Sequence, residues 1–231
     1  MSTGKPILDA WLAFSVEHPE LQQFGQTGDV STFNGATGCT HACFQRLILG
    51  IKGQHVTQDQ ISRACGHPWP RNNRAMRGMY SPQEGMRVVV HYGLPYQYLY
   101  RPAWSTVMKA LALGPVLLPV KYDWWPEWRG CVRYGVRADG RPNGFALRGG
   151  KTQIFGFSGT HAVLVLGYHK TPAGYRAYAN EPNHGAPARP EKPPYDIVTT
   201  AQLKKAWEKT LLLQPNWAYV PTRAVRPKGF A

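Results

Sequence analysis

The sequence has few cysteines, few acidic residues and no long apolar run. Four cysteines in 231 residues are too few for a disulfide scaffold, and no CxxC pair occurs, so free thiols are expected. The apolar stretch Leu111–Val120 is interrupted by Gly114, Pro115 and Pro119, and a bilayer-spanning helix needs about 20 apolar residues. Asp9 lies within the apolar part of the N-terminus, and no small-residue cleavage site follows. We therefore expect no membrane span, no signal peptide and synthesis in the cytoplasm.

Basic residues dominate the charge. Lys and Arg number 27 against 13 Asp and Glu, which gives a formal net charge of +14 and a pI of about 9.8. Such a chain is drawn toward polyanions such as nucleic acid, teichoic acid or anionic lipid. The basic residues are spread over several segments instead of one face or helix: Arg71–Arg77, Arg129–Arg148 and Arg223–Lys228. We therefore predict no specific nucleic-acid recognition.

Hydrophobic periodicity and turn residues predict helices first and strands later. Aromatic residues make up 12% of the chain, with eight Trp, enough apolar surface to exclude intrinsic disorder. Helices are predicted over 6–19, 39–53, 57–65, 81–93, 104–113 and 199–211, and strands over 94–99, 115–122, 161–168, 175–180 and 217–220. Residues 183–195 are predicted to form a Pro-rich loop. This order is typical of the α+β class and not of alternating βαβ units.

Cys39 is the first candidate for chemistry, because a loop rich in Gly, Thr, Ser and Asn leads directly to it at a predicted helix start. The partial positive charge and free N–H groups of a first helical turn favour the thiolate, and they can also hold an oxyanion. A small buried residue is the alternative interpretation of Cys39. Cys43, four residues later, is expected in the core.

A nucleophilic thiolate needs a histidine, usually from a distant segment. His161 begins the most apolar strand of the C-terminal half, whereas the other histidines lie in loops or at the ends of elements. A hydrogen-bonded core histidine is the alternative. The next strand ends in Asn180 and Glu181, and either could accept the second ring N–H; only one of two adjacent strand residues can face the ring.

These motifs, taken in order, resemble the bacteriocin-processing (double-glycine leader) peptidases, a branch of the papain-like cysteine peptidases. The resemblance covers about residues 31–220 and rests on Cys39-x-x-Ala42-Cys43, Ala110 to Val116, Gly159 to Tyr168, and Asn180-Glu181-Pro182. It implies a papain-like fold, with N-terminal helices packed on an antiparallel sheet. It also implies that Cys39 is the nucleophile, His161 the general base and acid, and Glu181 the orienting acid where the family has Asp.

The sequence departs from this family pattern in three places. Thr40 replaces the Gly that follows the cysteine, and the oxyanion Gln of the family falls on Phe33. Asn34 is the nearest amide and our substitute for that Gln; without it, backbone N–H groups would act alone. Glu181 is one methylene longer than Asp, so Asn180 remains its competitor for the third role.

The CHAP amidase/endopeptidase domains, which hydrolyse peptidoglycan, are a second and weaker resemblance. It rests on Gly38-Cys39-Thr40 and on His161 followed by Glu181-Pro-Asn183. The distance in sequence between Cys39 and His161 exceeds what that compact domain usually holds, although an insertion at 124–159 accounts for part of it. Both resemblances imply thiolate attack, an acyl-enzyme and hydrolysis.

The expected domain boundaries follow from the resemblance and from the composition of each segment. Residues 1–30 are expected to form an N-terminal helical extension, residues 31–220 the papain-like domain with an inserted hairpin or lobe at about 124–159, and residues 221–231 a basic tail. The inserted segment contains Trp124, Trp125 and Trp128, a candidate substrate-binding cluster that could equally be a packed corner or lid.

The predicted function is a cysteine hydrolase that cleaves peptide or isopeptide bonds, with bacterial peptidoglycan as the favoured substrate. Without a leader, delivery by lysis, a phage particle or an export machine is expected, so we favour a phage lysin or virion-associated enzyme with other virion proteins as partners. The alternative is an inactive papain-like module, for example of a phage tail, which the loss of the amide at position 33 favours. No cofactor is expected. A zinc site at Cys39, His41 and Cys43 is disfavoured, because the spacing differs from that of ordinary structural sites.

Overall fold

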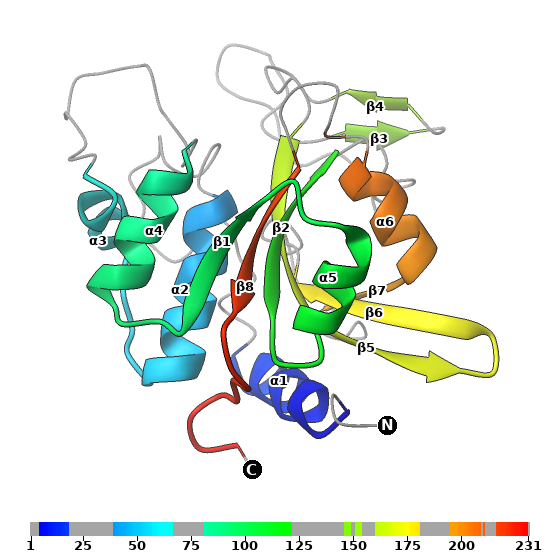
Figure 1. Cartoon of the computed structure of the whole chain (residues 1–231), viewed down its shortest axis with the longest axis horizontal. Helices are drawn as coiled ribbons and strands as arrows, with labels where there is room; N and C mark the ends of the chain where they lie inside the picture. Colours follow the sequence, from blue (N-terminus) through cyan, green and yellow to red (C-terminus); the bar gives the residue numbers. More distant parts are fainter. Residues whose placement is uncertain are drawn as a thin grey trace.

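The computed structural model describes residues 5–18, 39–66, 81–121, 146–148, 151–153, 160–180, 195–208, 210 and 216–230 (Figure 1). The helices are α1 Lys5–Glu17, α2 Cys39–Lys52, α3 Gln58–Ala64, α4 Pro82–His91, α5 Trp104–Ala110 and α6 Thr200–Glu208. The strands are β1 Tyr96–Tyr100, β2 Val116–Lys121, β3 Ala146–Arg148, β4 Lys151–Gln153, β5 Thr160–Thr171, β6 Gly174–Asn180, β7 Asp196–Thr199 and β8 Trp217–Pro221. Within these residues, no helix has both the length and the apolar character to cross a membrane.

Local sequence signals account for the helix boundaries. Thr57 and Ser81 each accept a hydrogen bond from a backbone N–H one turn later, and the side chain of that later residue accepts from the backbone N–H of the cap. Thr199 and Gln202 make the same reciprocal pair before α6. Gly53 follows α2 with a φ of 66°, a left-handed conformation that glycine adopts without strain. The predicted helices are therefore confirmed wherever the structure describes them, with ends shifted by a few residues.

Six of the strands form one sheet in the order β1-β8-β2-β5-β6-β7, and each neighbouring pair is antiparallel. The apolar strand β2 is central, as its sequence predicts, and pairs with β5 from Val116↔Val165 to Lys121↔Thr160. β5 and β6 form the predicted hairpin. A mixture of helices with an antiparallel sheet confirms the α+β class. In the region of the predicted insertion, β3 and β4 form a separate antiparallel pair.

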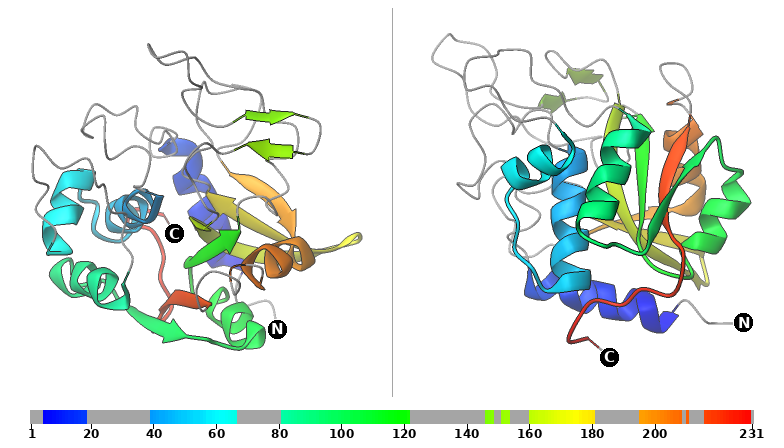
Figure 2. Two further views of the ribbon diagram at one scale, coloured as in Figure 1. Left: turned by 90° about the horizontal axis from the view of Figure 1, so that it is seen from above. Right: turned by 60° about the vertical axis from the view of Figure 1, so that its left-hand side comes forward.

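The sheet is covered on both faces (Figure 2). Alternate residues of β5 belong to different cores: Ala162 and Leu164 pack with side chains of α1 to α4, whereas Val163 and Val165 pack with side chains of α5 and α6. Both cores are formed by buried aliphatic and aromatic groups. The core between the sheet and α1 to α4 is called the first core below. Cys39 packs against it, so the first core positions the candidate site.

Both end segments of the described chain pack against this first core. Trp11 of α1 is fully buried, and its indole N–H donates to the Val225 carbonyl at 3.0 Å. The Lys228 N–H donates to the Gly50 carbonyl at 2.6 Å, so the C-terminal residues lie against α2. The predicted boundaries at residues 30 and 220 remain predictions, but the segment expected as a basic tail is held to the core by these contacts.

One strand was missed by the sequence analysis. β7 (Asp196–Thr199) pairs with β6 from Arg176↔Thr199 to Ala179↔Asp196, whereas the sequence predicted a loop over 183–195, a helix from residue 199 and no element between them. Among the side chains described for this segment, Val198 is buried and Ile197 is 48% exposed, so the segment shows little of the apolar character of a central strand. A four-residue edge strand is decided by its partner, because its own pattern is too short to be distinctive.

Candidate active site

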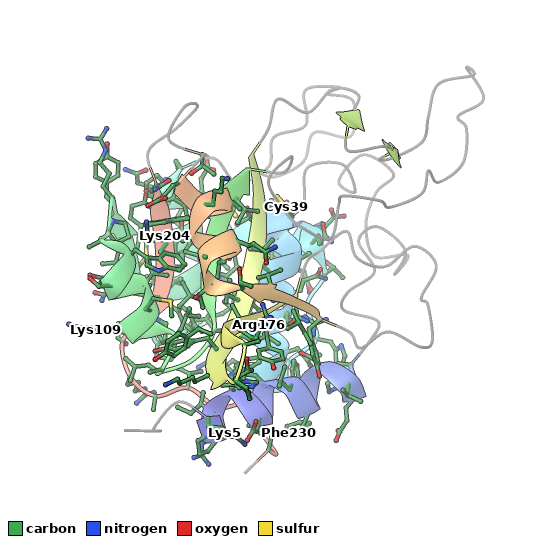
Figure 3. All side chains as sticks on the ribbon, turned by 90° about the vertical axis from the view of Figure 1, so that its right-hand side faces the viewer. Lys5, Cys39, Lys109, Arg176, Lys204 and Phe230 are labelled. Atoms are coloured by element: carbon green, nitrogen blue, oxygen red, sulfur yellow. The ribbon has the colours of Figure 1, made fainter. Side chains whose placement is uncertain are left out.

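Cys39 stands at the first residue of α2, as predicted, and is partly buried against the first core. Figure 3 shows it at the end of the molecule opposite Lys5 and Phe230. Its Sγ lies 4.0 Å from Thr40 Oγ1, the hydroxyl that replaces the family glycine. A thiol at this position lies next to the N–H groups of the first helical turn, which stabilise negative charge on sulfur or on a nearby oxyanion.

A direct contact ties α2 to the start of β5. The Cys43 thiol, one turn after Cys39, donates to the Ala162 carbonyl at 3.8 Å, and Cys43 is only 2% exposed. This confirms the core position expected for Cys43. Ala162 is the residue after His161, so the contact brings the chain around His161 to the first turns of α2.

The direction of the two elements follows from their packing on α1. A Cβ at Gly50, near the end of α2, would lie 2.5 Å from Trp11 Cζ3, and a Cβ at Gly167, in the second half of β5, would lie 3.1 Å from Leu8 Cδ1. The later parts of α2 and β5 therefore both contact α1. Both elements begin at the end of the sheet that lies away from α1, as Figure 1 shows.

The backbone of His161 is part of β5, where it pairs with Val120 of β2. The side chain of His161 lies outside the described part of the structure, so its pairing with Cys39 stays a prediction. Relative to the two residues of the Cys43–Ala162 contact, the backbone of Cys39 lies about 6 Å closer to the start of α2. The backbone of His161 lies about 3 Å closer to the start of β5.

Asn180, the last residue of β6, is 4% exposed, and its Oδ1 accepts a hydrogen bond from Ser15 Oγ of α1 at 3.3 Å. Its competitor Glu181 and the oxyanion candidate Asn34 lie outside the described residues. The candidate substrate cluster Trp124, Trp125 and Trp128 also lies outside them. The roles assigned to these residues therefore remain predictions.

His41, a member of the disfavoured zinc set, is buried and not on the surface. It is 4% exposed, and its Nε2 lies 3.1 Å from Ser62 Oγ of α3. Cys65 is 1% exposed, and burial, reinforced by the nearby Glu84 carboxylate, raises the pKa of its thiol to about 12. Within the described ranges, no three His, Cys, Asp or Glu side chains gather as metal ligands.

Aromatic side chains of β1 and β8 lie toward the same end of the sheet as Cys39, and sequence reasoning did not identify them. Tyr98 and Trp217 stack with centroids 6.4 Å apart, and both pack, like Cys39, against the first core. Tyr100, which pairs with Trp217, is 59% exposed. Such rings can stack on sugars or pack against peptide side chains, so this row is a candidate substrate surface. Tyr98 and Tyr100 lie in β1 and Trp217 lies in β8, so only the pairing of these two strands reveals the cluster.

Comparison with known proteins adds little to this description. No protein-family model matches the chain, and no curated protein matches it. Among solved structures, the chain is similar to a Bacillus anthracis protein provisionally described as a C39-like peptidase. The two share 13% sequence identity over 81% of this chain and 90% of that chain, with a TM-score of 0.47. This likeness is too weak to carry an argument about family or reaction.

Proposed function

We propose that the protein is a cysteine hydrolase that cleaves peptide or isopeptide bonds, with Cys39 as nucleophile and His161 as general base and acid. One observation carries the proposal: α2 begins at Cys39, and its second turn contacts the residue that follows His161. A thiol at a helix start and a histidine at the start of an adjacent strand thus come from segments that are far apart in the sequence.

The chemistry follows from these two side chains. The Cys39 thiolate attacks the substrate carbonyl carbon, and N–H groups of the first turn of α2 stabilise the oxyanion that forms. The C–N bond then breaks as the His161 imidazolium gives its proton to the leaving amine. Water, deprotonated by the neutral imidazole, attacks the resulting thioester and releases the carboxylic acid and free thiol group. Glu181 would accept the second ring N–H and stabilise the imidazolium.

Peptide crosslinks of bacterial peptidoglycan are the substrate that we propose. A net charge of +14 favours binding to an anionic cell wall. On the described surface, exposed basic side chains include Lys52, Arg223, Arg226 and Lys228. A phage lysin or virion-associated enzyme would meet this substrate directly, which makes phage-mediated delivery part of the proposal.

The first test measures release of new amines from purified peptidoglycan and from casein-like peptides. We expect Cys39→Ala to lower the rate by roughly a thousandfold or more, because the nucleophile is lost. Cys43→Ala is the matched control: it removes a thiol from the same helix, one turn away and inside the core, and should retain activity. Wild-type protein that releases no amines from either substrate would leave only an inactive binding or structural module.

Thiol reactivity tests the nucleophile without a substrate. Cys39 should react with iodoacetamide faster than an ordinary thiol at pH 6 to 7, because pairing with imidazole increases the thiolate fraction. The site of alkylation is identified by peptide mass spectrometry, and His161→Ala should slow it. A rate for Cys39 that equals that of a model thiol, and is unchanged by His161→Ala, would argue against the pair.

A further inference from the structure

Residues 221–230 form a strap that runs across the end of the molecule opposite Cys39 (Figure 1 and Figure 3). Three backbone N–H groups of this C-terminal strap donate to carbonyls of other segments: Thr222 to Pro95 at 2.9 Å, Val225 to Leu113 at 2.7 Å and Lys228 to Gly50 at 2.6 Å. The Val225 carbonyl also accepts from the Trp11 indole N–H. The backbone of the strap is therefore anchored along its length, so its side chains project from defined positions.

The side chains of the C-terminal strap divide into two sets. Val225 and Pro227 are buried, whereas Arg223, Arg226 and Lys228 are exposed. Within the described part of the chain, none of these three basic side chains forms an ion pair or a hydrogen bond. The buried residues and the backbone bonds account for the anchoring, so the three charges are available to a ligand.

Lys52, an exposed residue at the end of α2, extends this basic surface. A Cβ at Gly53 would lie 3.6 Å from Lys228 Nζ, and a Cβ at Gly93 would lie 3.4 Å from Lys52 Nζ. The loop that contains Gly93 also binds the start of the strap, next to Arg223. We call the surface formed by these side chains the basic end: Lys52, Arg223, Arg226 and Lys228.

Acidic residues are scarce around the basic end. The sequence ranges 39–58, 85–121 and 210–231, which supply α2, the loop before β1 and the strap, contain no Asp or Glu. α1 lies against the strap and carries Asp9, which is paired with Lys5 at 2.8 Å, and the exposed Glu17. Four cations with so little opposing charge produce a positive potential at this end of the molecule, which attracts polyanions.

The form of the strap distinguishes among polyanions. Proteins that recognise duplex DNA place a helix or a β-ribbon in a groove, and proteins that bind single strands stack the bases on aromatic rings. The strap is irregular, and its Phe230 ring packs edge-to-face on Phe14. Insertion into a bilayer requires apolar area, and the neighbouring Leu113 is only 38% exposed. An extended row of cations fits best a flexible chain that carries regularly spaced phosphates.

We propose that the basic end binds a phosphate polymer of the bacterial wall, of the teichoic acid type, and tethers the protein there. Cys39 lies at the opposite end of the molecule and would stay accessible to peptide crosslinks while the polymer is bound. The inference rests on the proposed function, because that function makes the wall the target. It adds a second binding site that is separate from the site of cleavage.

The binding test uses immobilised teichoic acid and Cys39→Ala protein, at several salt concentrations. The test variant removes three charges from the strap: Arg223→Gln, Arg226→Gln and Lys228→Gln. It should lower the affinity by roughly tenfold to a hundredfold and make the salt dependence less steep, because fewer counterions are released. The matched control removes three charges from α3, β5 and α6: Arg63→Gln, Lys170→Gln and Lys204→Gln. Equal losses in both variants would overturn the inference, because binding would then follow net charge alone.

Two further comparisons test the integrity of the variant and the choice of ligand. A variant that conserves charge should keep the affinity and the wild-type Tm: Arg223→Lys, Arg226→Lys and Lys228→Arg. A loss of affinity in this variant at an unchanged Tm would overturn a tether based on charge. Duplex DNA and vesicles of phosphatidylglycerol are the competing ligands. If the strap residues contributed more to binding either of these than to binding teichoic acid, a wall polymer would be the wrong ligand.

Activity separates this inference from the proposed function. The strap variant with an intact Cys39 should show a raised KM on walls that carry teichoic acid and an unchanged kcat/KM on a soluble peptide. Strap-dependent binding by a protein whose Cys39 is unreactive would remove the proposed function but keep the tether. Cleavage of soluble peptides and walls with no effect of the strap residues on KM or binding would remove the tether but keep the proposed function.

Discussion

Gly50 lies where α2 crosses α1, and the substitution Gly50→Ala tests how these helices hold Cys39 in place. A Cβ at this position would lie 2.5 Å from Trp11 Cζ3, and it would overlap Cη2 of the same ring. Ordinary carbon–carbon contacts are about 3.5 to 4.0 Å, so the helices would have to separate by roughly 1 Å. Trp11 cannot move away easily, because it is fully buried and its N–H is bound to the Val225 carbonyl.

Two effects of opposite sign contribute to the free energy of unfolding. Alanine is a better helix former than glycine by about 1 kcal/mol, which would stabilise α2. Overpacking costs about 1 to 3 kcal/mol, and the rigid, buried ring places this site at the upper end of that range. We therefore expect Gly50→Ala to destabilise the protein by about 2 kcal/mol. For a chain of this size, that corresponds to a fall in Tm of about 4 to 8 °C.

Thermal unfolding followed by circular dichroism measures this effect, with a second background as control. In Trp11→Phe the benzo ring that carries Cζ3 and Cη2 is absent, so Gly50→Ala should there be neutral or slightly stabilising. The exposed helical substitution Ser105→Ala should leave Tm nearly unchanged in both backgrounds. A higher Tm for Gly50→Ala in the wild-type background would refute the reasoning, because helix propensity would then outweigh the contact.

Three further predictions concern α3 and α4. The raised pKa of Cys65 means that the unfolded chain ionises first, so its contribution to stability is complete below pH 9 and is lost as the pH rises toward about 12. Urea unfolding at pH 8 to 11 should show a steeper alkaline loss for wild type than for Cys65→Ala, by at most about 1.4 kcal/mol per pH unit; parallel curves would contradict the raised pKa. Thr57→Ala should lower the free energy of unfolding by about 1 kcal/mol, because the N-cap of α3 is lost, and the urea midpoint measures this change. Thr57→Ser keeps the capping hydroxyl and should retain the wild-type stability. Gly85→Ala should lower Tm, since a Cβ there would overlap Tyr219 Oη, and an unchanged Tm would show that this ring can move.

Most helices could be predicted from the sequence because their signals are local. Thr57, Ser81 and Thr199 are caps whose partners lie three residues away, and Gly53 ends α2 through its own backbone conformation. The strands β2 and β5 were also recognisable, because each is a local run of apolar residues long enough to be distinctive. The placement of Cys39 at a helix start belongs to this group.

Features that depend on distant partners could not be predicted. The short strand β7 gains its structure from β6, and the aromatic row arises only when β1 pairs with β8. The Ser15–Asn180 bond joins residues 165 positions apart, and no local pattern distinguishes that serine from any other. The choice between Asn180 and Glu181 remained open for this reason.

The amino-acid sequence by itself determined where helices begin and end, which strands are buried, and that a thiol stands at a helix start, because each depends on residues within a turn or two. Only the tertiary structure decided that α2 lies beside the start of β5, that the C-terminal segment packs on α2, and that Asn180 faces α1. Each of these arrangements is one of many possible ways of packing the chain, because its apolar surfaces have similar chemistry. Shape complementarity and buried hydrogen bonds select among them only when the whole chain is folded.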